Sequence, residues 1–330
     1  MRSDKLFLRL AILAAALAFG VVMLGAYVRL SQAGLGCPDW PGCYGHLTVP
    51  PADQAGALAA GRPLEASRAW KEMIHRYFAA SLATLILILA LLAFRRRREP
   101  GQPRLLPVLL LALVVFQALL GMWTVTLLLF PPVVMGHLLG GLATFALLVL
   151  LVLQSGGYLR EGAGATDLMR RLAAVGLAVL VCQIALGGWV SSNYAAIACP
   201  DFPTCWGEWW PRADFRAGFA WQGLGVDYQG GVLDNPARAA IHFSHRLGAL
   251  ATFVVLGGAS LRVFLLGGSR RLRLLGGLVG VLLLAQILIG VSLIKFGWPL
   301  VLADLHNGGA ALLLAATVTL NWAVWSARKT

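Results

Sequence analysis

Glu72-Met73-Ile74-His75-Arg76-Tyr77 starts an apolar run that continues to Phe94, and His242-Phe243-Ser244-His245-Arg246-Leu247 starts another that continues to Leu261. In both stretches an ionisable residue stands three positions before a histidine, so the two side chains share one helix face. An arginine follows each histidine directly. Ionisable groups near the end of a membrane helix are costly and by default mark a functional site. The recurrence of this pattern 170 residues later therefore predicts two related sites.

The composition is that of a membrane protein. Hydrophobic residues make up 59% of the 330 residues and charged residues only 12%, whereas soluble domains carry roughly 25% charged residues. The net charge of +13 suggests nucleic acid at first, but the basic residues are not clustered with aromatic residues on a soluble module. They fall between apolar runs, so membrane topology explains them better and no nucleic-acid partner is expected.

Eight apolar runs each approach the roughly 20 residues that cross a bilayer. The predicted spans are 10–30, 72–94, 105–127, 133–154, 172–192, 239–262, 272–294 and 300–325. The first run resembles a signal peptide, but it is long enough to span the membrane and no clear cleavage pattern follows it. We therefore expect a retained helix and, because the number of spans is even, both termini on the same side.

Basic residues between the spans predict the orientation. The terminal segments and the second, fourth and sixth connections together hold 17 of the 27 Lys and Arg residues. These are Arg2, Lys5, Arg9, Arg95, Arg96, Arg97, Arg98, Arg104, Arg160, Arg170, Arg171, Arg262, Arg270, Arg271, Arg273, Arg328 and Lys329. By the positive-inside rule, such short segments face the cytoplasm. The expected location is an inner (cytoplasmic) membrane, with cytoplasmic termini and two long periplasmic loops, about 31–71 and 193–238.

Four of the five cysteines lie in these two loops with equal spacing, as Cys37 and Cys43 and as Cys199 and Cys205. Paired cysteines on the outer face of a bacterial-type membrane readily form disulfides, so we expect Cys37–Cys43 and Cys199–Cys205. For each pair, a purely structural staple is as well supported as any further role. Zinc is disfavoured because this spacing is not that of a zinc finger and only His46, a loop residue given no role, is near.

The chain reads as a tandem repeat. Gly25 and Cys37 correspond to Gly187 and Cys199 at an offset of 162, His75 to His245 at 170, and Gln117 and His137 to Gln286 and His306 at 169. Each half has four spans, so the copies run parallel about an axis along the membrane normal. The predicted fold is an all-α membrane protein of eight transmembrane helices in two pseudo-symmetric four-helix bundles. The halves are 1–155 and 156–330, with a linker near 155–171.

Four histidines, His75, His137, His245 and His306, occupy matching places a few residues inside the outer end of an even-numbered span. A rise of about 1.5 Å per residue places all four within roughly 10 Å of the outer surface. The second and fourth helices of each half run in the same direction, so their histidines can face each other across the bundle. A haem iron takes two axial imidazoles in this way. We predict two haem sites, although a single membrane histidine is often just hydrogen-bonded to a neighbour.

Residues near the histidines suit a haem. Glycines beside His137 and His306 allow a planar ring to approach the backbone. Arg76 and Arg246, and more weakly Arg29, are candidates for binding haem propionates, because guanidinium pairs well with carboxylate. Taken alone, the glycines also fit helix packing and the arginines ordinary snorkelling. The matched histidines favour the haem interpretation.

The chain resembles the haem A synthase family over nearly its whole length. The resemblance rests on the eight spans in two halves and on motifs that are specific only as a set. They are Glu72-Met73-Ile74-His75-Arg76, the Cys37/Cys43 loop, Gly136-His137, His245-Arg246 and Leu305-His306-Asn307.

This resemblance implies a reaction, a substrate and a cofactor. The reaction is oxidation of the C8 methyl of haem O, through hydroxylated intermediates, to the formyl group of haem A. Haem b is then held by His245 and His306 in the C-terminal half. Haem O, the substrate, is held by His75 and His137 in the N-terminal half. The resemblance also ties Cys37 and Cys43 to activity and implies a membrane-bound haem-dependent oxidoreductase that contributes to cytochrome oxidase assembly.

The two halves differ at one ionisable position, where Glu72 of the first is replaced by His242 in the second. A carboxylate can accept a proton, or stabilise a cation, when a methyl group is oxidised. Glu72 is therefore the predicted catalytic residue, and the C-terminal copy is expected to bind haem without this chemistry. Two alternatives stay open: a salt bridge between Glu72 and Arg76, and His242 rather than His245 as the iron ligand.

Other functions fit parts of the pattern. A di-haem cytochrome b that only carries electrons is distinguished by the Glu72/His242 difference alone. A membrane thiol:quinone oxidoreductase explains the cysteines but leaves four histidines without a role, and a transporter is disfavoured because broken midplane helices are not evident. The resemblance implies haem O synthase and an electron acceptor as partners, and the apolar outer faces suit membrane lipid or a second copy equally well.

Overall fold

The computed structural model describes residues 5–56, 61–99, 101–158, 164–221 and 223–326, and within these ranges the chain is helical apart from loops and two isolated β-bridges. The eight long helices are α1 (Lys5–Leu30), α3 (Ala66–Arg95), α4 (Leu105–Thr126), α5 (Pro131–Gly156), α6 (Asp167–Ser192), α8 (Asn235–Leu266), α9 (Arg270–Lys295) and α10 (Leu300–Trp325). Short helical turns lie in the long loops: η1 (Ala52–Gln54), η3 (Ala196–Ala198) and α7 (Phe215–Gly218). The predicted all-α class is confirmed.

The eight helices coincide with the predicted spans, but several extend beyond the apolar runs. Polar caps explain three of these extensions, since the side chains of Thr166, Asp234 and Ser269 accept hydrogen bonds from the first free N–H groups of α6, α8 and α9. Helix α3 starts at Ala66 rather than at 72. Hydropathy alone misses these first turns because they are polar.

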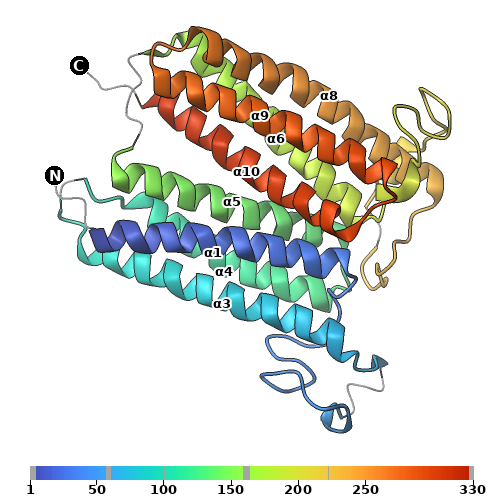
Figure 1. The fold of residues 1–330 in the computed structure, drawn as a ribbon. Coiled ribbons are helices and arrows are strands. Elements are labelled where there is room, and N and C mark those ends of the chain that lie inside the picture. The colour runs from blue at the N-terminus through green and yellow to red at the C-terminus, as the bar shows by residue number, and fades with distance from the viewer. Residues whose placement is uncertain (1–4, 57–60, 100, 159–163, 222, 327–330) are drawn as a thin grey trace.

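Figure 1 shows the helices in two groups that lie side by side, α1, α3, α4 and α5 in one and α6, α8, α9 and α10 in the other. Within the first group, α1 and α4 each pack against α3 and α5; within the second, α8 and α10 each pack against α6 and α9. Contacts of α1 with α10, and of α5 with α6 and α10, join the groups. This grouping follows the predicted halves, whose division into two functional units stays a prediction.

Small residues let the two groups approach closely. Ala11, Ala14 and Ala18 of α1 are buried in one hydrophobic cluster that draws on both groups. At Gly308 of α10, an added Cβ would lie 2.6 Å from the sulfur of Met23 in α1. With no large side chain between them, van der Waals packing can hold the helices together, as is usual where no water drives association.

The outward faces of the helices are apolar. All eight long helices contain 18-residue windows with a mean hydropathy between 1.4 and 2.5 and few charges, and large side chains such as Val254, Val281 and Leu288 are exposed on them. In water such a surface would cause aggregation, whereas in a bilayer it faces acyl chains. The chain is therefore a multi-pass membrane protein.

The two long loops lie at one end of the bundle, which we call the loop end (Figure 1). The four histidines lie near this end, with His137 and His306 each six positions after the first residue of its helix. Which side of the membrane the loop end faces stays a prediction. Of the basic residues behind that prediction, Arg2, Arg160, Arg328 and Lys329 lie outside the described residues.

Candidate functional site

Each of the four histidines packs against a glycine on the preceding long helix. A Cβ added to the glycine would lie 3.0 to 3.4 Å from Cε1 of the histidine ring. The distances are 3.0 Å for Gly25 and His75, 3.4 Å for Gly121 and His137, 3.1 Å for Gly187 and His245, and 3.1 Å for Gly290 and His306. The imidazole edge thus rests on bare backbone in all four places. A larger residue at any of these glycines would push the ring out of position.

The four histidines come from two helices of each group. His75 of α3 lies within electrostatic range of His137 of α5, and His245 of α8 within range of His306 of α10. The facing of the two rings in each half, like their ligation of a metal, stays a prediction.

The surroundings of Nδ1 suit a haem-ligating role for His245 and His306. Nδ1 of each lies at hydrogen-bond distance from the amide nitrogen of a glutamine. A metal-bound histidine commonly donates from its other ring nitrogen to a protein acceptor, and a half-turn of the amide would place the glutamine oxygen there. Nε2 is then the nitrogen that remains for iron. Nδ1 of His75 and of His137 has no hydrogen-bond partner among the described residues.

Two of the glycines beside the histidines leave room for protein side chains. A Cβ at Gly140 or at Gly309 would overlap the side-chain amide of a glutamine on the neighbouring helix, Gln117 or Gln286 respectively. The close approach of a planar ring to the glycines near His137 and His306 stays a prediction.

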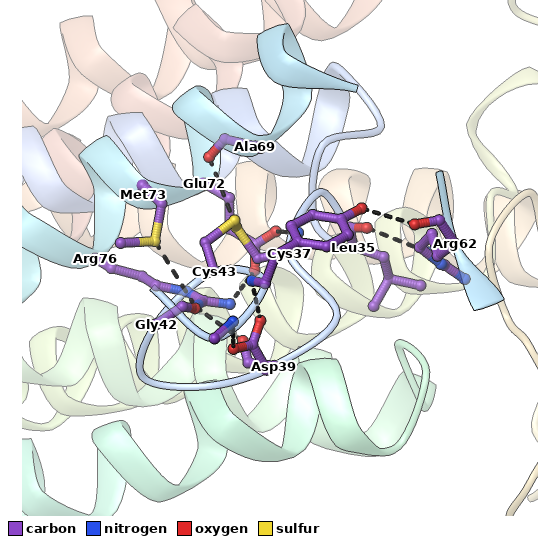
Figure 2. Close-up of a disulfide and its surroundings, with 12 residues drawn as sticks. Leu35, Cys37, Asp39, Gly42, Cys43, Arg62, Ala69, Glu72, Met73 and Arg76 are labelled. Atoms are coloured by element: carbon purple, nitrogen blue, oxygen red, sulfur yellow. Dashed lines mark hydrogen bonds and ion pairs between the residues drawn. A yellow bond between two sulfur atoms is a disulfide. The ribbon is translucent and has the colours of Figure 1, made fainter. Parts of the chain in front are cut away.

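Glu72 lies beneath the first disulfide loop, one helical turn from His75 (Figure 2). Its side chain is buried, with the residue 5% exposed. Oε2 accepts a hydrogen bond from the N–H of Cys37 at 3.0 Å, and Oε1 forms an ion pair with Arg76 at 2.6 Å. The salt bridge left open by the sequence is present, and the loop N–H is a further partner that spacing along the chain did not indicate.

Arg76 holds the first loop to α3. Its Nη1 donates to the backbone carbonyls of Asp39 at 3.0 Å, Pro41 at 3.2 Å and Gly42. Cys37 and Cys43 are joined by a disulfide and buried beneath this loop. Arg76, Glu72 and the disulfide loop thus form one connected unit, as Figure 2 shows.

Arg246 holds the second loop in a similar way. Its guanidinium donates to the carbonyls of Thr204 at 2.7 Å, Asp201 at 2.8 Å and Cys199 at 3.0 Å, and Cys199 is joined to Cys205. The Thr204 hydroxyl, followed by the N–H groups of the next turn, lowers the pKa of the exposed Asp201 carboxyl. Both loops are therefore fixed by an arginine directly after a histidine.

The second half has no counterpart of the carboxylate–loop contact. His242 is 3% exposed, its Nδ1 has no hydrogen-bond partner among the described residues, and its ring meets Trp298 edge-on with centroids 5.8 Å apart. The two sites thus differ chemically where their sequences differ. His242 as an iron ligand stays an untested alternative to His245.

Arg29 links the two groups of helices. Its Nη2 donates to the carbonyl of Ser191 at 2.6 Å, and its guanidinium lies 4.0 Å from the centre of the Tyr194 ring. All three arginines predicted to bind propionates therefore use their guanidinium groups on protein partners, chiefly backbone carbonyls. Propionate binding by Arg29, Arg76 and Arg246 stays a prediction.

Sequence analysis missed Gln183 and Gln286. Gln286 was matched to Gln117 by the repeat but received no role, and Gln183 was not noticed. A usable signal was present, because Gln117, Gln183 and Gln286 each stand four positions before a glycine that contacts a histidine.

The disulfides give a direct test. Alkylation of the unreduced full-length protein under denaturing conditions, followed by mass spectrometry, should modify Cys182, which is free and lies on the outer face of α6. Cys37, Cys43, Cys199 and Cys205 should be modified only after reduction. Labelling of any of these four without reductant would contradict both the structure and the sequence prediction, and Cys182 serves as the internal control.

Comparison with known proteins agrees with this architecture. The chain matches the model of the COX15-CtaA family, described as cytochrome oxidase assembly protein, over residues 8–318. It is 45% identical over 312 residues to the heme A synthase of Shewanella oneidensis, with 92% of each chain covered. The heme A synthase of Caulobacter sp. strain K31 is 29% identical over 334 residues, covering 94% of this chain and 93% of that protein.

The eight long apolar helices among the described residues define a multi-pass membrane protein. The chain belongs to the COX15-CtaA family of cytochrome oxidase assembly proteins.

Proposed function

We propose that this protein is a haem A synthase, a membrane oxidoreductase that converts the C8 methyl of haem O to a formyl group through the hydroxylated haem. Haem A synthase is the name of its relatives at 45% and 29% identity, each matched over most of both chains. The structural observation that carries the proposal is the buried carboxylate of Glu72 one turn from His75, with no carboxylate in the equivalent place of the second half.

The two halves have different roles, one binding a resident haem and the other the substrate. His245 and His306 hold a resident haem b, whose iron supplies electron-transfer chemistry when bound. His75 and His137 hold the haem O substrate near Glu72. The dissimilar residues at positions 72 and 242 support this assignment, because the first half has a buried carboxylate at this position and the second half has a histidine.

Glu72 serves the oxidised methyl group as proton acceptor or as a negative charge beside a cationic intermediate. Arg76 and the Cys37 N–H bind one carboxylate oxygen each, so the orientation of the carboxylate depends on the disulfide loop. This connection gives the pair Cys37–Cys43 a structural reason to affect activity.

The membrane location and the partners follow from the same assignment. The protein lies in an inner (cytoplasmic) membrane with its termini cytoplasmic and the loop end periplasmic, as the basic segments predict. A haem O synthase delivers the substrate and a separate electron acceptor removes the electrons. The apolar outer faces contact lipid and are available to a second copy of the chain.

Extraction and chromatography of the haems from purified protein tests the function. Cells that make haem O should yield protein containing haem b together with haem A or hydroxylated haem O. Haem b alone, in cells that make haem O, would instead identify a cytochrome that only carries electrons. No haem at all would overturn the proposal and favour thiol chemistry at the loops.

A further inference from the structure

Three glutamines repeat one arrangement around the histidines. Each stands four positions before the glycine on which a histidine ring rests, and the histidine is followed three positions later by a second glycine. The sets are Gln117, Gly121, His137 and Gly140; Gln183, Gly187, His245 and Gly248; and Gln286, Gly290, His306 and Gly309. The glutamine and the histidine thus come from neighbouring helices at a fixed register.

In the second half, each glutamine side chain contacts its histidine at two points. Nε2 of Gln183 lies 3.1 Å from Nδ1 of His245 and donates to the backbone carbonyl of His245 at 3.0 Å. Nε2 of Gln286 lies 3.2 Å from Nδ1 of His306 and donates to the backbone carbonyl of His306 at 2.8 Å. A contact to both the ring and the backbone of one residue restricts rotation of that ring.

The glycine three positions after each histidine leaves room for the glutamine side chain. A Cβ at Gly248 would overlap Oε1 of Gln183, and a Cβ at Gly309 would overlap Oε1 of Gln286. Both amide oxygens are buried and have no hydrogen-bond partner among the described residues. When Nε2 of the ring binds a metal, Nδ1 carries the proton. A half-turn of the amide then presents Oε1 as the acceptor for that proton and gives up the bond to the carbonyl. With a metal bound, the glutamine therefore holds the ring through this one hydrogen bond.

In the first half the arrangement is incomplete. At His137 the amide of Gln117 is turned the other way, with Nε2 rather than Oε1 nearest to Gly140, and neither that Nε2 nor Nδ1 of His137 has a hydrogen-bond partner among the described residues. At His75 the arrangement is absent, since Val21 stands four positions before Gly25 and Phe78 follows His75 by three. His75 is therefore the ring without a glutamine, although all four rings rest on glycine.

We infer that Gln183 and Gln286 are positioning residues that fix the rings of His245 and His306, so that the second half retains its haem, while the first half, whose His75 has no such glutamine, can release one. This inference rests on the proposed function, which assigns the resident haem to His245 and His306. It explains how two similar sites serve a cofactor that stays and a substrate that must leave.

Replacing either glutamine by methionine keeps the length of the side chain and removes the amide. In purified full-length Gln183→Met and Gln286→Met, haem b should still be bound, but its transfer to apomyoglobin should be about tenfold faster, the effect of losing roughly one hydrogen bond. The electron paramagnetic resonance g-values should also shift, because they depend on the relative orientation of the two axial imidazoles.

Two further variants complete the test. Gln117→Met changes the matching position of the first half and should leave the release rate and the g-values of haem b unchanged. Gln286→Glu keeps an acceptor for Nδ1–H and should restore slow release. Unchanged release and g-values in both methionine variants, or an equal effect of Gln117→Met, would overturn the inference. Wild-type protein without bis-histidine haem b would instead overturn the proposed function on which it rests.

Discussion

Glu72→Ala should reduce conversion of haem O by about 100- to 10,000-fold, the range typical for loss of a positioned acid or base, while haem b remains bound. The substitution removes the only carboxylate that the described residues place beside His75, together with its bonds to Arg76 and the Cys37 N–H. Haem chromatography should show haem b with unreacted haem O. The second half is untouched, because its site uses His242 at this position.

Two variants distinguish a chemical role of Glu72 from a purely structural one. Glu72→Gln keeps the size and the acceptor for Cys37 but removes the charge, and it should be nearly as inactive as Glu72→Ala. Glu65→Ala removes another carboxylate near the start of the same helix, one paired with Arg68 at 3.0 Å and well exposed, and should retain full activity. Active Glu72→Gln would show that the carboxylate only anchors the loop. Loss of haem b in Glu72→Ala would contradict the division between the halves.

His306→Ala should abolish the haem b spectrum. The substitution removes one of two axial nitrogens, and the alanine methyl offers no ligand in its place. Reduced-minus-oxidised absorption of the purified protein should show the low-spin signal missing, and activity should be lost with it. Because Gly290 and Gln286 pack against the His306 ring, the variant also loses contacts, so folding should be checked by its elution as a monodisperse detergent complex.

His137→Ala is the matched control, since His137 occupies the same position in α5 as His306 does in α10. It should keep the haem b spectrum and lose haem O conversion. An unchanged haem b signal in His306→Ala would refute the assignment of that ligand. Loss of haem b in His137→Ala and not in His306→Ala would show that the halves have the opposite roles.

The sequence by itself determined the number of helices and their places. Hydrocarbon requires about 20 apolar residues per helix, so the local composition indicates each span. The predicted runs match the eight long helices apart from polar first turns such as those capped by Thr166 and Asp234. The cysteine pairs were also predictable, because each pair is separated by only six positions.

Only the tertiary structure decided the partners of the polar side chains. Cys37 and Glu72 are 35 positions apart, Gln183 and His245 are 62 apart, and Arg29 and Ser191 are 162 apart. Inside a membrane protein a buried polar group must find a partner within the fold, but the sequence does not say which one is near. Helix packing and loop path bring these groups together, so that Arg76 and Arg246 contact loop carbonyls, and Gly140 and Gly309 leave room for glutamines.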